Sequence, residues 1–315
     1  MGENQLQDAP RKELLLDVPA EVEPSRHPHR EWEWRLYLKR HLPSERKIIK
    51  VMRTFFEGQR DRLLAAAGKL SDEQLRGRIP RLLNKEEENE KLKKVLSPAV
   101  KEVLGRFGQL AMDRLRKLLR TSTEDTAYDD EWIGHKQKLL KLGEFAFDLS
   151  DPVVIEWLKT HAGTNIVHIN DTTWALTLRR IRRELAVGLD AGESTALLRN
   201  RIRDSIKGIH TMNRNVRART IARTEVTGAS NVGTLTGFKQ SDVVESKEWL
   251  SAGDGDVRDE DFSHVDADGE IVQLGKEFKE TGEAMEYPGD QGGSPGNVIN
   301  CRCTMNPILK STAGE

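Results

Sequence analysis

The amino-acid sequence predicts a mainly α-helical protein, with a long helical body followed by a small α+β C-terminal module. Charged residues make up 32% of the 315 residues and aromatic residues only 5%, which favours helices with broad solvated faces over a thick packed sheet. Apolar residues recur at helical spacing from Ser44 to about Gly237. After Gly237, glycine, aspartate and proline become frequent and the apolar runs shorten, as expected for short strands and turns.

The first 30 residues predict a disordered or extended N-terminal arm, because they carry several prolines and few apolar clusters. The segment that follows, 31–42, concentrates aromatic surface in Trp32, Trp34 and Tyr37. Aromatic side chains are enriched among the anchors of protein interfaces, so these three residues are candidates for binding a partner protein. The sequence leaves open the alternative that they pack against the chain's own helical body.

Capping signals predict where the helices begin. One helix is expected to start at Ser44, and another at Ser97-Pro98, where proline would occupy the first helical position. A third is expected to start at Asp171-Thr172. A shorter helix, 194–207, should follow the turn that ends at Ser194.

These elements predict two domains after the N-terminal arm. The first is a helical body over 31–164. The second covers 165–315 and consists of helices within 171–238 and a small α+β module over 239–305. No repeat with a period of 20–50 residues is present, which argues against a solenoid.

The predicted helix Arg219–Phe238 is rich in small residues, including Ala222, Gly228 and Gly233. Small residues at helical spacing allow a second backbone to approach closely, so we expect this helix to be packed tightly against another element. Glu225 on the same helix could act as a general base. However, no histidine or second carboxylate stands at a defined spacing from it, so a structural ion pair or cap is the favoured role.

Both cysteines of the chain, Cys301 and Cys303, lie in a third predicted strand, 297–305, after expected strands at 247–251 and 270–274. Side chains at i and i+2 of a strand share one face, so the two sulfurs should lie side by side. A disulfide between them is disfavoured, because their Cα atoms would stand at the long limit for the bond.

With His264, the two cysteines form a candidate zinc site, for which Asp259, Asp261 or Asp290 could supply a fourth ligand. The alternative is a pair of small buried cysteines and a histidine bound to the backbone. A catalytic thiol is a further interpretation, with His264 as the base of Cys301, but the sequence offers no third member.

A nuclease centre in the acidic loop is an equally weak interpretation, since clusters such as Asp254, Asp256 and Asp259 are usually surface turns. The charge distribution is more informative. Residues 171–223 hold eleven arginines and one lysine against five acidic residues, whereas 241–296 hold sixteen acidic residues against four basic ones.

The basic helices could therefore contact DNA phosphates, a contact that does not depend on base sequence. The candidates for this contact are Arg179, Arg180, Arg182 and Arg183. No recognition motif or interleaved aromatic residues accompany these arginines, so ion pairing within the helical bundle is the favoured alternative.

The order of motifs in the C-terminal half is characteristic. The helix 221–231 is followed by Trp249–Arg258, Ser263-His264, Asp268-Gly269, the loop Tyr287-Pro288-Gly289-Asp290, and Asn300-Cys301-Arg302-Cys303. Over roughly residues 165–305 this order resembles the head-morphogenesis, or Mu F-type, minor capsid proteins of tailed bacteriophages. Many members carry a Cys-x-x-Cys pair where this chain has Asp261 and His264, and the loop before His264 is longer here.

The resemblance implies a minor head protein of a phage or prophage, present in few copies inside the procapsid and not an enzyme. It also implies portal protein and other head proteins as partners, and packaged DNA as a non-specific one. Some members are fused to nuclease or other toxin domains, but this chain ends twelve residues after Cys303, which we interpret as leaving no room for one.

The alternatives are a nuclease or toxin-type enzyme that uses the His264, Cys301 and Cys303 cluster, and a DNA-binding protein that acts through 171–223. The sequence lacks an apolar run of 18 residues and a secretory signal, so no membrane partner is expected. The expected location is the virion, at the portal vertex, and the host cytoplasm during assembly.

Overall fold

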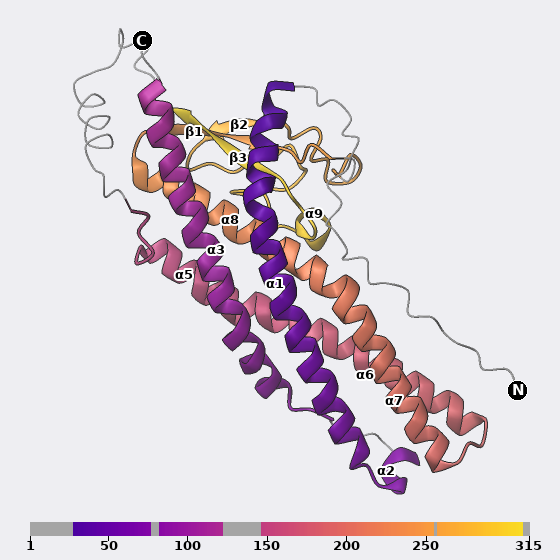
Figure 1. Ribbon diagram of the computed structural model, residues 1–315. Coiled ribbons are helices and arrows are strands. Elements are labelled where there is room, and N and C mark those ends of the chain that lie inside the picture. Colours follow the sequence, from indigo (N-terminus) through magenta and orange to yellow (C-terminus); the bar gives the residue numbers. More distant parts are fainter. Residues whose placement is uncertain (1–27, 77–81, 122–145, 255–256, 311–315) are drawn as a thin grey trace, which may run out of the picture.

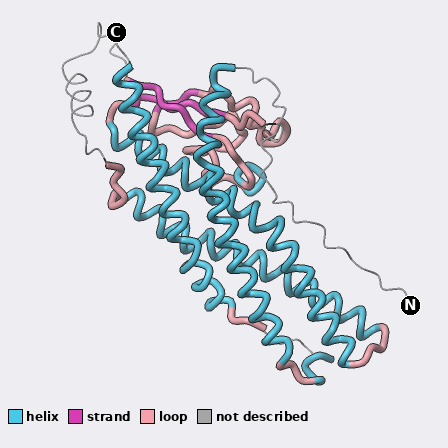
Figure 2. The backbone as a smooth tube through the Cα atoms, viewed as in Figure 1, coloured by secondary structure: helices cyan, strands magenta, loops and turns pink. Residues whose placement is uncertain are grey.

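The computed structural model describes residues 28–76, 82–121, 146–254 and 257–310. Long helices run alongside one another through most of the molecule, and a small sheet lies at one end of them (Figures 1 and 2). The helices are α1 (Pro28–Gly68), α2 (Asp72–Arg76), α3 (Lys85–Thr121), α5 (Pro152–Thr160), α6 (Ile166–Asp190), α7 (Thr195–Met212), α8 (Ala218–Ser241) and α9 (Pro295–Val298). The strands are β1 (Val244–Leu250), β2 (Ile271–Gln273) and β3 (Thr304–Leu309). The predicted fold class, a mainly helical body with a small α+β C-terminal module, is confirmed.

Two predicted helix starts are wrong, because each helix continues through its proline. Helix α1 begins at Pro28 and passes Pro43, and α3 begins at Lys85 and passes Pro98. An internal proline removes one backbone hydrogen bond and costs about 3 kcal/mol. Burial compensates for this cost in α3, where Leu92 and Leu96 before the proline are as fully buried as the residues after it.

The start expected at Asp171-Thr172 is also wrong, because α6 begins five residues earlier, at Ile166. Asp171 does not cap a helix but pairs with Lys85 at 2.8 Å. The Thr172 hydroxyl donates to the carbonyl of His168 at 2.9 Å, a bond within the helix. The start at Ser194 is confirmed, since its hydroxyl accepts from the Leu197 amide at the beginning of α7.

Helices α3 and α8 pack with their backbones in close contact, as the small residues of α8 predict. A β-carbon added at Gly233 would lie 2.2 Å from the carbonyl oxygen of Leu104. One added at Gly237 would lie 2.9 Å from the carbonyl oxygen of Gly108. Glycine at these positions is therefore what allows the two helices to approach each other.

The sheet is antiparallel, with strand order β2-β1-β3. The register places Trp249 of β1 opposite Met305 of β3, and Lys247 opposite Val272 of β2. The third strand starts at Thr304, so the prediction that the cysteines lie within a strand is wrong. Residues 295–298 form the short helix α9, and Asn300 has a positive φ of 64°, which turns the chain before Cys301.

One hydrophobic core joins α1, α3, α8, the sheet and its loops. Trp34 and Tyr37 are part of this core, with 2% and 9% of their surfaces exposed. A second core, at the far end of the long helices, joins α1 and α2 to α6 and α7. The predicted boundary near residue 164 falls within a short π-helical segment, His161–Asn165, that leads directly into α6.

Of the predicted N-terminal arm, residues 1–27 lie outside the described residues. In the part of the chain that the structure describes, no helix combines the length and the apolar character needed to span a membrane.

Candidate functional site

The C-terminal motif brings His264, Cys301 and Cys303 together, as the sequence predicts. All three side chains are buried, and their ligand atoms lie within 4.8 Å of one another. The Nδ1 atom of His264 lies 3.4 Å from the Sγ of Cys303 and 3.7 Å from that of Cys301. The turn at Asn300 brings the two sulfurs together, although neither cysteine lies in a strand.

Hydrogen bonds orient each member of this cluster. The Nε2 atom of His264 lies 2.7 Å from Oδ1 of Asn297, an arrangement in which Nε2 donates and Nδ1 is left facing the sulfurs. The Ala252 amide donates to Cys303 Sγ, and the Cys303 amide donates to Cys301 Sγ, each at 3.4 Å. These contacts fix the positions of the imidazole and of both sulfurs.

The protonation tendencies of the three side chains are coupled. A hydrogen bond from Cys303 lowers the pKa of Cys301, whereas burial raises the pKa of Cys303 well above its usual value. Burial alone would lower the pKa of His264, but its contacts with Cys303 and Asn297 outweigh this effect and raise it.

Three of the four groups of a structural zinc site are present in a suitable arrangement. Tetrahedral zinc, with Zn–S bonds of about 2.3 Å and Zn–N bonds of about 2.0 Å, separates its ligand atoms by roughly 3.5–3.8 Å. The two N···S distances are close to this range: 3.7 Å for Cys301 lies within it, and 3.4 Å for Cys303 lies just below it. Asn297 supplies the contact that metal-bound histidines usually make through their second nitrogen. His264, Cys301 and Cys303 would hold the ion, which would cross-link the loop before β2 to the segment before β3.

None of the three predicted fourth ligands joins this cluster. Asp259 and Asp261 are exposed on their loop. Asp290 instead closes its own loop, accepting from the amides of Gly292 at 3.0 Å and Glu286 at 2.9 Å. The fourth-ligand prediction is therefore wrong for this structure, because each carboxylate is solvated or already bound to the backbone.

The catalytic interpretation gains a third member that the sequence did not reveal. Asn297 contacts the imidazole of His264, so a Cys-His-Asn arrangement exists. However, Cys301, Cys303 and His264 each expose 2% of their surface or less. A nucleophile must reach its substrate, and a thiol that is enclosed by the core does not.

Among its described residues, the acidic loop does not assemble a nuclease centre either. Asp254 is buried and pairs with Arg302 at 2.6 Å. Asp259 is exposed, and Asp256 lies outside the described residues. Within the described ranges, His264, Cys301 and Cys303 are the one group of three potential ligands close enough to share an ion.

Helix α8 holds the Cys-Arg-Cys segment in place through polar side chains. The hydroxyl of Thr227 donates to the carbonyl of Cys301 at 2.6 Å. The amide of Asn231 donates to the carbonyls of Cys303 at 2.9 Å and Pro288 at 2.7 Å. The helix, the loop around Pro288 and the cysteine segment therefore form one hydrogen-bonded unit, which explains why these motifs occur together in the sequence.

Glu225 forms a buried contact with His161, as expected for the structural ion pair that the sequence favours. Its carboxylate hydrogen-bonds to Nε2 of His161, and both side chains are almost fully buried. The ring of Trp157 stacks on His161 with centroids 5.0 Å apart. Sequence spacing could not identify His161, because it lies 64 residues away and enters from the π-helical segment before α6.

Helix α1 carries the aromatic residues for which the sequence left open either partner binding or packing within the chain. The indole of Trp34 donates to the carbonyl of Arg302 at 3.2 Å, and the hydroxyl of Tyr37 lies 2.9 Å from that of Ser230. Binding of a partner through Trp34 and Tyr37 is therefore contradicted, because these side chains are occupied within the chain. Trp32 differs, with 59% of its surface exposed.

Further along α1 lies a buried polar cluster that the sequence did not indicate. Nε2 of His41 lies 3.2 Å from the hydroxyl of Thr227. Glu45 is fully buried and lies 3.6 Å from His41 and 3.7 Å from Arg223. Burial raises the pKa of Glu45 and lowers that of His41 to about 3, so this histidine is neutral at physiological pH.

The four arginines proposed to contact DNA lie on α6 and are exposed: Arg179, Arg180, Arg182 and Arg183. Arg183 is the one that pairs with a described carboxylate, Glu184, at 3.4 Å. Arg179 and Arg182 line an open groove together with Lys85 and Trp174. Among the described contacts, therefore, none of the four arginines pairs with a carboxylate of another helix, and Arg183 pairs with a neighbour on its own helix.

Comparison with known proteins relates part of this chain to a protein family. Residues 179–306 match the family described as Phage Mu protein F like protein. An uncharacterized protein of Bacillus subtilis (strain 168), YqbB, is 34% identical over 97 residues, which are 30% of this chain and 32% of that protein. The chain thus covers about a third of the length of this curated relative. No solved structure matches the chain significantly.

The matched range begins within α6, at Arg179, and then contains α7, α8, the sheet as far as Asn306 and the whole His-Cys-Cys cluster. It also includes Thr227 and Asn231, which bind the cysteine segment. The resemblance inferred from the order of motifs is confirmed for this range: residues 179–306 form a phage Mu protein F-like domain.

Proposed function

We propose that the chain is a minor head protein of a tailed bacteriophage or prophage. In this role it associates with the portal vertex and other head proteins, and assists procapsid assembly and DNA packaging or delivery. The observation that supports the proposal is the Mu F-like domain over residues 179–306. Its motif residues bind one another and the backbone, as Asn231 does, which suits a rigid assembly module.

An enzyme is the competing class, and the environment of the cluster argues against it. The candidate nucleophile and base, Cys301 and His264, are enclosed by the core. Glu225 is bound to His161 in the interior. Catalysis requires these groups to meet a substrate, whereas structural cross-linking requires them to be buried.

We expect the chain to be found in purified heads of its own phage at far lower copy number than the major capsid protein. Quantitative mass spectrometry of procapsids would measure this ratio, and chemical cross-linking should join the chain to the portal protein. A nonsense mutation in its gene should reduce the yield of filled heads, and expression in trans should restore it. Absence of an expressed chain from procapsids and mature heads would contradict the proposal.

Non-specific DNA binding is a second candidate function, supported by the exposed arginines of α6. Arg179 and Arg182, which pair with no carboxylate of the described residues, share an open groove with Lys85. Guanidinium groups in such positions can contact phosphates without reading the bases. The contact would suit a protein that lies near packaged or translocating DNA.

If the face binds DNA, duplex affinity should fall linearly with the logarithm of salt concentration, with a slope of about −0.9 per phosphate contact. A variant with glutamine at 179, 180, 182 and 183 should lose roughly three to four units of that slope. Fluorescence anisotropy with an arbitrary duplex would measure both. Arg35→Gln is a control on a distant exposed arginine, and equal slopes in the three proteins would refute the α6 site.

A further inference from the structure

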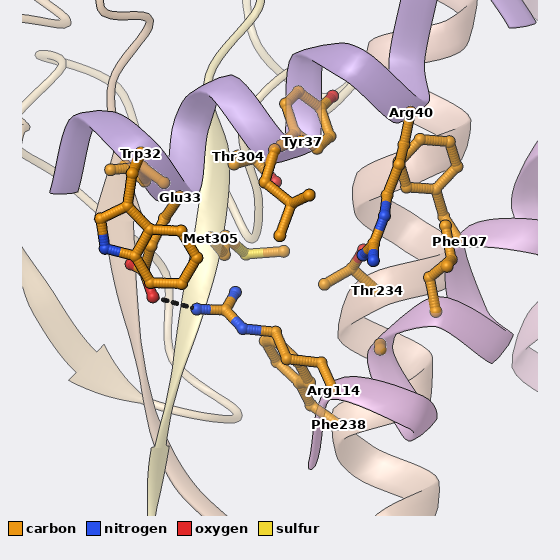
Figure 3. A pocket seen from close by; sticks show the side chains of 14 residues that line it. Trp32, Glu33, Tyr37, Arg40, Phe107, Arg114, Thr234, Phe238, Thr304 and Met305 are labelled. Atoms are coloured by element: carbon orange, nitrogen blue, oxygen red, sulfur yellow. Dashed lines mark hydrogen bonds and ion pairs between the residues drawn. The ribbon is translucent and has the colours of Figure 1, made fainter. Parts of the chain in front are cut away.

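A groove opens between α1, α3, α8 and β3, near the end of the molecule that carries the sheet (Figure 3). Its cavity measures about 70 Å³. The floor is apolar and includes Phe107, Phe238 and Met305. These floor residues belong to the main core, so the groove lies over packed side chains.

Two apolar side chains of α1 line the groove and reach the solvent. Trp32 exposes 59% of its surface and Leu36 exposes 39%. They stand four residues apart, so both lie on one face of the helix. Exposed tryptophan beside an apolar hollow is the arrangement found at the anchoring points of protein interfaces.

Two guanidinium groups enter the groove from opposite sides, Arg40 from α1 and Arg114 from α3 (Figure 3). Arg114 is bound to Glu33 at 2.6 Å and to Asn306 at 3.1 Å. Burial lowers the pKa of Arg114. The positive charge of Arg40 also lowers this pKa, whereas the negative charge of Glu33 raises it.

Glu33 is the one carboxylate among the lining residues, and it is bound to Arg114. Arg40 pairs with no acidic side chain of the described residues. The groove therefore combines an apolar floor with one uncompensated positive charge. A negatively charged group next to an apolar side chain would complement both features.

We propose that this groove binds an acidic segment of a partner protein, which inserts one phenylalanine or leucine side chain between Trp32 and Met305 and places a carboxylate on Arg40. Neither this binding nor its test depends on the role in phage heads, because the groove is complete within one chain.

The test uses the full-length chain and a fluorescein-labelled peptide, Glu-Asp-Leu-Phe-Asp-Glu, followed by fluorescence polarisation. Saturable binding is expected. Replacing the Leu-Phe pair of the peptide by Ala-Ala should weaken it at least tenfold, since a buried large apolar side chain contributes about 1.5–3 kcal/mol. Trp32→Ala should have a similar effect, and its exposed position should leave the melting temperature unchanged.

Charge reversal gives the sharpest readout. Arg40→Glu should weaken the acidic peptide by roughly tenfold or more and strengthen binding of Lys-Lys-Leu-Phe-Lys-Lys. Lys39→Glu changes the same net charge on the neighbouring exposed residue, which does not line the groove, and should alter neither affinity more than about twofold.

Three outcomes would overturn the proposal. The first is no saturable binding of the acidic peptide, and the second is equal loss in the Arg40→Glu and Lys39→Glu variants. The third is concentration-dependent dimerisation in analytical ultracentrifugation that Trp32→Ala abolishes, which would assign the groove to a second copy of the chain. Failure of the head-protein proposal would leave these binding results unaffected.

Discussion

Replacing Gly233 with alanine is expected to destabilise the protein by about 3 kcal/mol or more. The new β-carbon would lie 2.2 Å from the carbonyl oxygen of Leu104 and 3.0 Å from the amide nitrogen of Gly108. Both neighbours are backbone atoms of α3, so no side-chain rotation can relieve the clash. The two helices must separate, which opens gaps in the main core. Chemical denaturation would measure the free energy of unfolding.

Gly228→Ala is the matched control, because it places the same methyl group on the same helix. Its β-carbon would lie 3.4 Å from the carbonyl oxygen of Gly289, an ordinary van der Waals distance. Alanine is favoured over glycine within a helix by roughly 0.5–1 kcal/mol, so this variant should be unchanged or slightly more stable. Equal stability of the Gly233 and Gly228 variants would show that the close approach of α3 and α8 does not limit stability.

The close packing of α8 at its glycines could be predicted from the sequence, because helical spacing and the absence of a side chain are local properties. The helix starts could not be predicted in the same way. Proline at 43 and at 98 signals a boundary locally, yet both helices continue because residues on either side share one buried face. For α3 the apolar period from Leu92 to Leu104 crosses Pro98 without interruption, so that signal outweighs the proline.

The candidate site shows the same limit. The types and order of residues identified His264, Cys301 and Cys303, because few side chains bind metals or carry thiol chemistry. Asn297 was missed as the partner of His264, because a turn of α9 directs it there. His161 was missed as the partner of Glu225 for a similar reason, since only the folded chain brings the two together.

The aromatic segment was ambiguous for a physical reason. Composition alone cannot distinguish an interface anchor from a core residue, because both bury apolar area. In the structure, Trp34 and Tyr37 are buried and hydrogen-bonded within the chain, whereas Trp32 is exposed at the groove. Helical geometry accounts for the division, since Trp34 and Tyr37 stand three residues apart on the buried face and Trp32 lies to one side of it.

Replacing both cysteines with serine is expected to lower the free energy of unfolding by at least about 3 kcal/mol and to reduce incorporation into heads. Cys301 and Cys303 are buried beside His264, and the hydroxyls of serine bind zinc poorly and are costly to bury. Thermal and chemical unfolding would measure the loss. If zinc is the cross-link, elemental analysis should find about one ion per wild-type chain and none in the variant.

A chelator should then reproduce the effect of the double variant on the wild-type protein. Asp261→Asn is the matched control, because this exposed carboxylate is not part of the cluster and its loss should leave both metal content and stability unchanged. A metal-free wild-type protein that is nevertheless destabilised by the serines would show that packing of the sulfurs, and not zinc, supports the module. A double variant as stable and as well assembled as wild type would contradict both forms of the structural role. In that case the Cys-His-Asn arrangement with Asn297 would require a test for catalysis, beginning with whether an opening of the core exposes Cys301 to a thiol-alkylating reagent.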